Sequence, residues 1–305
     1  MSYGDGGDGY GPGPGPVQGI DMGRLVRYGI GLLIALFGIV TYMMRTEVNP
    51  VTGEKQHIGM NVDQEKALGL QAAPEMAAKM GGDVDPRADP RARVVADVGR
   101  ELVQRGDAER SPYAGNFHFH LLNDPKTINA FALPGGQIFI TRALFDKLAN
   151  EGQLAGVIGH EIGHVVNRHS AQQMAKGQLG QILSTAVGVG ASGDQRGQQA
   201  AQAAMMANQM MQLKYGRGDE SEADHYGLKY MVQAGYDPTC MLDVMNILKE
   251  AASGGRQPEI LSTHPLPETR IQEIKDALKA EYPNGIPASL SKGRALPSAR
   301  LSAAR

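Results

Sequence analysis

Two histidines one helical turn apart, inside an apolar stretch, restrict this sequence more than any other feature. Across residues 153–169 apolar side chains recur at the spacing of a helix, and His160 and His164 lie four residues apart within that stretch. Residues four apart share one face of a helix, so both imidazoles can point at the same place. Burying them beside Glu161 is costly unless these polar groups find partners. The chain must therefore fold so that this helix meets something that both histidines can bind.

A metal ion is the partner that this spacing favours. The residues His160-Glu161-Ile162-Gly163-His164 match the arrangement in which two histidines hold zinc and the glutamate between them acts as a general base. The sequence has one cysteine, so neither a thiolate cage nor a disulfide within the chain is possible, and the ligands must be imidazoles and carboxylates. We therefore expect one Zn²⁺ per chain, with Glu161 activating the attacking water. The alternative is an ordinary helix that carries two histidines and a glutamate.

A catalytic zinc site needs a third protein ligand and one open position. A third histidine ten residues after His160 is ruled out, because that position holds Ser170. A carboxylate from a later helix is the other possibility, and Glu220 and Asp224 lie four residues apart on one face. Glu220 can ligate the metal while Asp224 accepts a hydrogen bond from a ligand imidazole. Glu222 is expected to point elsewhere, as a solvated carboxylate near the start of its helix.

Composition narrows the classes of partner. The chain has 30 basic and 32 acidic side chains, so no strongly basic surface is indicated. It also has no tryptophan on which bases could stack. Nucleic acid is therefore not an expected partner.

An uncharged run of 17 residues near the N-terminus, residues 28–44, is at the short end of what crosses a bilayer as a helix. A cleaved signal peptide is the rival interpretation, but no small-x-small cleavage site follows Thr41; a buried core helix is the other. We expect a single-pass membrane anchor. Arg24 and Arg27 on one side outweigh Arg45 on the other, which favours an N-terminus in the cytoplasm and a C-terminal part in the periplasm or outside the cell.

The pattern along the chain predicts an α+β fold that is mainly helical. Strands are expected at residues 117–122 and 137–140. Helices are expected at 63–81, 90–104, 141–149, 151–175, 198–214, 219–234, 238–252 and 267–281, and glycines 156, 159 and 163 are expected to let another element pack closely on the fourth of these. The expected order is a disordered Gly/Pro-rich tail (1–23), a transmembrane anchor (24–45), an extended linker (46–62), one metallopeptidase domain (63–286) and a disordered tail (287–305).

Five ordered segments resemble the HtpX/Oma-type zinc metallopeptidases: NAFALPGG (129–136), GHEIGHVVNRHS (159–170), ESEADHYG (220–227), AGYDP (234–238) and STHPLPETRI (262–271). The resemblance spans about residues 60–282 and implies a zincin-like domain with a small sheet beside the active-site helix. It implies that Glu220, and not Glu222, ligates zinc. It further implies quality-control proteolysis of misfolded or misassembled envelope proteins, with unfolded or misassembled proteins as substrates. Together with the arginine asymmetry, it leads us to expect a bacterial inner membrane with the domain facing the periplasm.

Two residues of the last segment are candidates for the reaction itself. His264 and Arg270 are each expected to stabilise the oxyanion that forms during attack, although Arg270 also fits a charge on a helix surface. The family resemblance suggests in addition that His264 fills the open zinc position at rest and moves away for catalysis.

Substrate is expected to bind as an added strand. If residues 137–141 form an exposed sheet edge, then Gln137, Ile138 and Phe139 can pair with a substrate backbone with little sequence preference. Asn129 is expected to help hold that edge or the substrate. The alternative is an ordinary internal strand.

Two other functions compete with proteolysis. One is a chaperone-like binding protein whose zinc site is closed most of the time. The other is a purely structural zinc domain, which has no need of Glu161 and is therefore less favoured.

Overall fold

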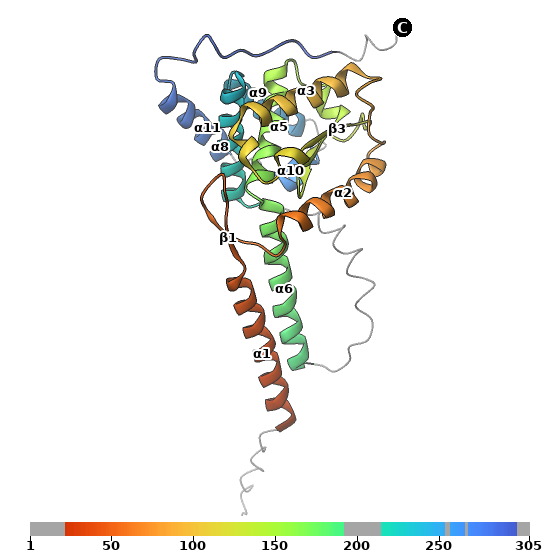
Figure 1. Cartoon of the computed structure of the whole chain (residues 1–305), viewed down its shortest axis with the longest axis vertical. Coiled ribbons are helices and arrows are strands. Elements are labelled where there is room, and N and C mark those ends of the chain that lie inside the picture. Colours follow the sequence, from red (N-terminus) through yellow and green to blue (C-terminus); the bar gives the residue numbers. More distant parts are fainter. Residues whose placement is uncertain (1–21, 192–214, 254–256, 266–267, 298–305) are drawn as a thin grey trace, which may run out of the picture.

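Helices make up most of the chain, and a small three-stranded sheet lies among them (Figure 1). The computed structural model describes residues 22–191, 215–253, 257–265 and 268–297. Its mainly helical architecture, with a small sheet and one apolar N-terminal helix, confirms the predicted fold class. The helix predicted at 198–214 and nearly all of the tail predicted at 1–23 lie outside the described residues.

The sheet forms from β3 (His118–Leu122), β4 (Ala130–Leu133) and β5 (Gln137–Thr141), in the order β3-β5-β4. β5 pairs parallel to β3 and antiparallel to β4. The β4–β5 connection needs glycine, because Gly135 and Gly136 have φ angles of +80° and +109°. Both strands predicted from the sequence are present, and β4 is an additional one.

The expectation of an exposed substrate-binding edge at Gln137, Ile138 and Phe139 is wrong. β5 is the central strand, with hydrogen-bonded neighbours on both sides, and all five of its residues are buried. Its backbone is therefore not available to a substrate strand. No strand is predicted at residues 130–133, where β4 pairs with one side of β5.

Helices surround this sheet. They are α2 (Val62–Lys79), α3 (Pro90–Arg105), α4 (Arg142–Phe145), α5 (Glu151–Val166), α8 (Arg217–Ala234), α9 (Thr239–Ser253), α10 (Ile260–Thr263) and α11 (Glu268–Glu281), with 3₁₀ turns η1 (Asp107–Arg110) and η2 (Ala114–Asn116). α5 runs through the centre, in contact with α3, α8, α9 and β4, and every one of its residues is buried. Polar groups on α5 therefore face protein rather than water, and they must be satisfied there.

The predicted helix 151–175 is two helices. α5 ends at Val166, and α6 (His169–Ala191) begins after Arg168, whose φ angle of 58° places a non-glycine residue in the left-handed region. The buried Arg168 guanidinium forms an ion pair with Glu65 of α2 and a hydrogen bond of 2.6 Å to Glu47. These long-range contacts stabilise a turn that local helical periodicity cannot reveal.

Two segments predicted to be extended or disordered pack against the domain. The predicted linker holds a hairpin of β1 (Thr46–Val48) and β2 (Lys55–His57), and Asn49 and Gln56 donate hydrogen bonds of 2.7 and 2.8 Å to the backbone carbonyls of Val166 and Asn167. In the predicted C-terminal tail, the carbonyl of Lys292 accepts a hydrogen bond of 2.8 Å from the N–H of Gly152. Both segments therefore anchor the ends of α5.

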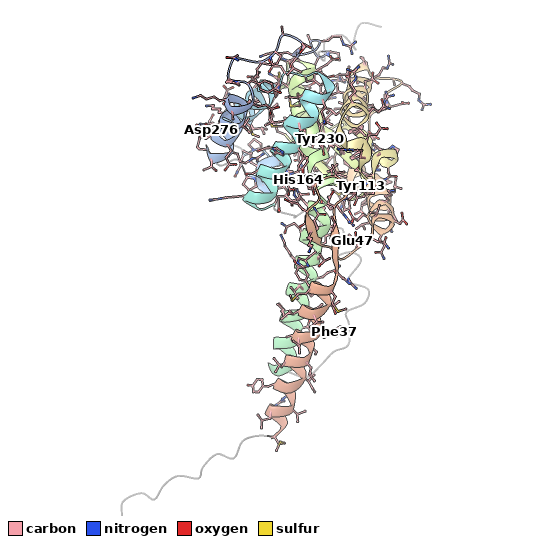
Figure 2. The ribbon with its side chains drawn as sticks, turned by 60° about the vertical axis from the view of Figure 1, so that its left-hand side comes forward. Phe37, Glu47, Tyr113, His164, Tyr230 and Asp276 are labelled. Carbon is pink, nitrogen blue, oxygen red and sulfur yellow. The ribbon has the colours of Figure 1, made fainter. Side chains whose placement is uncertain are left out.

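A stalk formed by α1 (Met22–Met44) and α6 projects from the body of the protein, which contains the sheet and the other helices (Figures 1 and 2). Within the described residues, one span, Leu25–Met44, is long and apolar enough to cross a membrane, with a mean hydropathy of 1.8. The large apolar side chains of α1 are mostly exposed, and Phe37 is 71% exposed. An exposed apolar surface of this size is unfavourable in water, which is consistent with a helix that is surrounded by lipid.

Candidate metal centre

The predicted metal-binding side chains come from α5 and from α8, which lies along it. Asn150 caps the start of α5, where its side chain accepts a hydrogen bond of 3.0 Å from the N–H of Gln153. From this fixed start, His160 and His164 fall on one buried face. Glu220 lies in the first turn of α8 and is fully buried.

Glycines let α5 and α8 approach closely. A Cβ atom on Gly163 would lie 2.8 Å from the carbonyl oxygen of Ala223, and one on Gly159 would lie 3.2 Å from that of Gly227. The predicted close packing on the glycines of α5 is therefore confirmed. The short distance between the two helices brings Glu220 to the imidazole pair.

Gly163→Ala is expected to destabilise the fold by about 1–3 kcal/mol, as overpacked cores do. It is also expected to weaken metal binding, because α8 must shift and carry Glu220 with it. Gly218→Ala is the matched control, since a Cβ atom there meets nothing within 4 Å. Denaturant midpoints and bound zinc measure the two effects. Equal midpoints for the two variants would show that the helices separate without cost.

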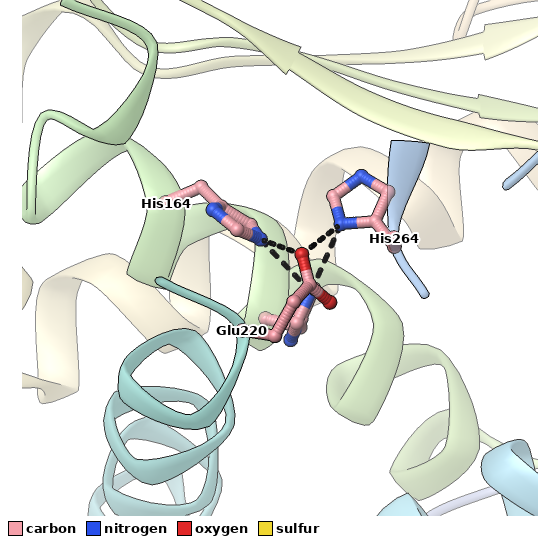
Figure 3. A group of neighbouring side chains, drawn as sticks. His164, Glu220 and His264 are labelled. Atoms are coloured by element: carbon pink, nitrogen blue, oxygen red, sulfur yellow. Dashed lines mark hydrogen bonds and ion pairs between the residues drawn. The ribbon is translucent and has the colours of Figure 1, made fainter. Parts of the chain in front are cut away.

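Four side chains converge on one point in the structure: His160, His164, Glu220 and His264 each offer a ligand atom, and these atoms lie within 4.8 Å of one another. His264 follows α10, and its Nδ1 atom lies 3.1 Å from Oε1 of Glu220 (Figure 3). The Nε2 atoms of His160 and His164 are 3.0 Å apart. The structure therefore brings the three predicted metal-binding residues together, and His264, which the family resemblance places at the open zinc position, lies with them.

The charge states of His164 and Glu220 suit a cation. Burial holds the pKa of His164 well below its usual value, so its imidazole is neutral at pH 7. Burial alone would raise the pKa of Glu220, but hydrogen bonds with His164 and His264 outweigh it and hold that pKa well below its usual range. Burial also disfavours the charged form of His264, yet the carboxylates of Glu161 and Glu220 raise its pKa overall.

Behind the cluster, Asp224 and Arg270 hold its members in place. Nδ1 of His160 donates a hydrogen bond of 2.9 Å to Asp224, which leaves Nε2 of that ring with a free lone pair. Arg270 donates hydrogen bonds of 2.8 and 2.7 Å to the two oxygens of Asp224, and others of 2.5 and 2.8 Å to Glu220 and to the carbonyl of Pro265. Arg270 is thus a buried partner of carboxylates. This placement corrects the surface-charge interpretation, because Arg270 is 4% exposed, whereas the expected oxyanion contact stays a prediction.

Glu161 lies beside this cluster and is 1% exposed, and neither of its carboxylate oxygens has a hydrogen-bond partner in the described structure. Burial raises its pKa, although His264 and His160 offset part of that effect. Oε1 of Glu161 lies 3.7 Å from Nε2 of His264. A buried carboxylate that accepts no hydrogen bond is costly, and such a group is typical of a functional site.

Sequence reasoning missed a second chain of contacts. Nδ1 of His169 lies 2.8 Å from Nδ1 of His164, and Nε2 of His169 lies 3.0 Å from Oε2 of Glu222. The ring of Tyr215 stacks on His164 with centroids 4.0 Å apart. The sequence predicts no role for His169, which lies five residues after His164, and Glu222 is expected to point away. The break at Arg168 alters the helical register, and no local pattern indicates the break.

The residues fit a tetrahedral zinc ion. Zinc–nitrogen and zinc–oxygen bonds of about 2.0–2.1 Å place neighbouring tetrahedral ligands about 3.4 Å apart. In the cluster, the distances from Nε2 of His160 to Nδ1 of His264 and to Oε2 of Glu220 are 3.3 and 3.6 Å, and Nε2 of His164 lies 3.4 Å from Oε1 of Glu220. The donor set, imidazole nitrogens with one carboxylate, is also the set that zinc prefers.

An apolar pocket adjoins the cluster. It encloses about 420 Å³ of space free of protein atoms, part of it open to solvent, and is lined by His160, Glu161, His264, Arg270 and apolar residues of α5, α9 and α10. Asn129, the predicted substrate-holding residue, lies at the start of β4; its side chain is buried and its Oδ1 atom has no partner among the described residues. The carbonyl of the preceding Ile128 accepts a hydrogen bond of 3.2 Å from the N–H of Ile260, which connects β4 to α10.

Residues 90–278, more than half of the chain, match the family model described as Peptidase family M48. The chain belongs to peptidase family M48. The matched region contains all four residues of the cluster. M48 is a metallopeptidase family, so a metal ion is implied, in agreement with the donor set.

Named M48 relatives extend this result. The chain is 31% identical over 249 residues to the beta-barrel assembly-enhancing protease of Yersinia pestis, covering 77% of this chain and 48% of the relative. It is 32% identical over 212 residues to the protein of that name from Escherichia coli K12, covering 66% and 42%. It is 30% identical over 251 residues to the mitochondrial metalloendopeptidase OMA1 of Schizosaccharomyces pombe, covering 81% and 71%. The chain therefore spans less than half the length of these two bacterial relatives.

Proposed function

We propose that this chain is a zinc-dependent endopeptidase. The observation that carries the proposal is the convergence of His160, His164 and Glu220 next to Glu161, a buried carboxylate that accepts no hydrogen bond within the described residues. A structural zinc site has no use for such a carboxylate, whereas a hydrolytic site needs a base there. Membership of peptidase family M48 supports the same assignment, and we place the peptidase domain at residues 63–286.

The roles of the residues follow from their positions. His160, His164 and Glu220 hold the ion, which supplies Lewis-acid activation of a water molecule and of the scissile carbonyl when it is bound. Glu161 accepts a proton from the attacking water and passes it to the leaving amine. Asp224 fixes the tautomer of His160. Arg270 acts as a positioning residue that holds the two carboxylates.

His264 closes the site at rest. A catalytic zinc site keeps one position for water or substrate, and His264 is in reach of that position, 3.3 Å from His160 and 3.1 Å from Glu220. Substrate entry then requires His264 to move away. Its place after the short helix α10, rather than inside a long helix, is compatible with such a movement.

The cellular role that fits best is quality control of misfolded or misassembled envelope proteins at a bacterial inner membrane. Two supports are the relatives named beta-barrel assembly-enhancing protease and the apolar span Leu25–Met44, which serves as the anchor. The excess of Arg24 and Arg27 over Arg45 favours a peptidase domain in the periplasm.

Casein cleavage tests the proposed activity. The purified full-length chain in detergent is expected to cleave casein, to lose at least 90% of that activity (about tenfold, or about 1.4 kcal/mol) after dialysis against a chelator, and to regain it with added Zn²⁺. Casein binding without cleavage at any zinc level would instead indicate a chaperone-like protein. Cleavage that persists in metal-free protein would contradict the zinc mechanism.

A further inference from the structure

The two helices of the stalk run antiparallel and touch along their length. α1 leads toward the body of the protein, α6 leads away from it, and both views show the two side by side (Figures 1 and 2). A Cβ atom on Gly38 of α1 would lie 2.6 Å from Cγ2 of Ile182, so glycine allows close contact there. Small residues at such contacts are typical of helix pairs in membranes.

This contact fixes the depth of α6. Gly38 lies within the uncharged run 28–44, six residues before its end, which is about 9 Å along a helix. If α1 crosses a bilayer, Gly38 lies inside the hydrocarbon, and Ile182, which touches it, must lie at the same depth. α6 cannot remain in water while it packs against the middle of a membrane-spanning helix.

Charges on the two helices mark a common boundary. Arg45 follows the last residue of the uncharged run of α1. It lines a small pocket together with Ala175 and Gln178 of α6, and the exposed Lys176 lies between these two residues in the sequence. Beyond Lys176, the described part of α6 (residues 177–191) has no charged residue. These 15 residues extend about 22 Å as a helix, against a hydrocarbon thickness of about 30 Å.

The polar groups of this part of α6 suit such a location. The hydroxyl of Ser184 donates a hydrogen bond of 2.9 Å to the carbonyl of Gly180, and that of Thr185 donates one of 2.9 Å to the carbonyl of Gln181. Hydroxyls that bond to their own helix need no water. The exposed amide of Gln181 lies only about 8 Å along the helix from Lys176, close to the polar boundary.

We propose that α6 beyond Lys176 inserts into the lipid bilayer beside α1 and forms a second membrane-embedded helix. The inference rests on the proposed anchor role of α1. It goes beyond the expected single-pass arrangement, in which α1 alone enters the bilayer. It also places the active site near the membrane. α6 begins at His169, which contacts His164, and Lys176 at the proposed boundary is seven residues, or about 10 Å, further along the helix. The site then works on polypeptide segments close to the bilayer surface.

Cysteine labelling in membranes tests the insertion. The native Cys240 is buried, and burial raises the pKa of its thiol to about 12, so the unsubstituted chain gives the labelling background. Three variants each add one cysteine at an exposed position: Ser184→Cys in α6, Phe37→Cys in α1, and Gln104→Cys on the surface of the body of the protein. A membrane-impermeant maleimide is applied to spheroplasts and, separately, to detergent-solubilised protein.

Ser184→Cys and Phe37→Cys are expected to label at least tenfold more slowly in membranes than in detergent, and Gln104→Cys at a similar rate in both. If Phe37→Cys is protected but Ser184→Cys labels as fast as Gln104→Cys, α6 lies outside the bilayer and the inference is wrong. If Phe37→Cys also labels in membranes, the anchor assignment of α1 fails as well. The casein assay is independent of both outcomes, so a failure here leaves the proposed peptidase activity standing.

Tryptophan fluorescence gives a second measurement that does not depend on thiol reactivity. The chain has no tryptophan, so Leu183→Trp in α6 reports its own surroundings without background. In vesicles of brominated phosphatidylcholine its emission is expected to fall at least twofold relative to unbrominated vesicles, as for Phe37→Trp. Emission as insensitive to bromine as that of Gln104→Trp would contradict insertion.

Discussion

Glu161→Gln is expected to lower the rate of peptide cleavage by about 10²–10⁴-fold while the chain keeps its fold and one bound zinc ion, because general acid–base catalysis contributes a factor of that size. Glutamine has nearly the same shape as glutamate but cannot accept a proton from water at neutral pH. The ligand atoms of His160, His164 and Glu220 are untouched by the change. Initial cleavage rates and zinc per chain are the two measurements.

Glu161→Gln is also expected to leave the stability of the metal-free chain unchanged or increased at neutral pH. Burial raises the pKa of Glu161, which means that its ionised form is less favourable in the folded chain than in the unfolded chain. Its contribution to stability is therefore present at low pH and is lost as the pH rises through the raised pKa. Melting temperatures of variant and parent should converge on acidification.

Glu75→Gln is the control for Glu161→Gln, because it makes the same chemical change on the exposed side of α2. It should keep parental activity, metal content and stability. Cleavage by zinc-loaded Glu161→Gln at more than a tenth of the parental rate would rule out Glu161 as the base. A loss of bound zinc in that variant would instead indicate that Glu161 contributes to the metal site.

Glu220→Gln is expected to reduce bound zinc from one ion per chain to nearly none, and to abolish cleavage at micromolar zinc. Residues that merely support a ligand change metal affinity about 10–100-fold, and the loss of a ligating carboxylate is expected to exceed that range. Glu220 is fully buried and lies 3.4 Å from His164 and 3.1 Å from His264, so no solvent molecule easily replaces it. Zinc affinity from competition with a fluorescent chelator measures the effect.

Glu222→Gln is the matched control for Glu220→Gln. The two residues share one helix and are two positions apart, but the carboxylate of Glu222 reaches His169 rather than the convergence point. Glu222→Gln should retain one zinc ion per chain, with an affinity loss of at most about 100-fold. If Glu222→Gln lost zinc and Glu220→Gln kept it, the assignment of the third ligand would be reversed.

Local pattern was sufficient for most helices and for part of the site. The spacing of His160 and His164 on an apolar helix predicts a shared metal, and the glycines of α5 correctly predict a close neighbour. The Glu220–Asp224 pair was likewise visible, because four-residue spacing on a helix places two carboxylates on one face. These features depend on which residues share a face of one helix, and the spacing of residues along the sequence gives this directly.

Features that depend on contacts between distant segments could not be predicted from the sequence. β5 is a central strand because β4 pairs with it, and the break between α5 and α6 is held by an ion pair between Arg168 and Glu65, 103 residues apart. Nothing in the local sequence around β5 or Arg168 indicates that β4 or Glu65 will be its partner.

The sequence by itself determined the ligand types, the central helix and the apolar N-terminal run. Only the tertiary structure decided that Arg270 faces carboxylates, that His169 lies between His164 and Glu222, and that α6 accompanies α1. The physical reason is that spacing along a helix fixes which side chains share a face, whereas the packing of separate helices fixes which faces meet.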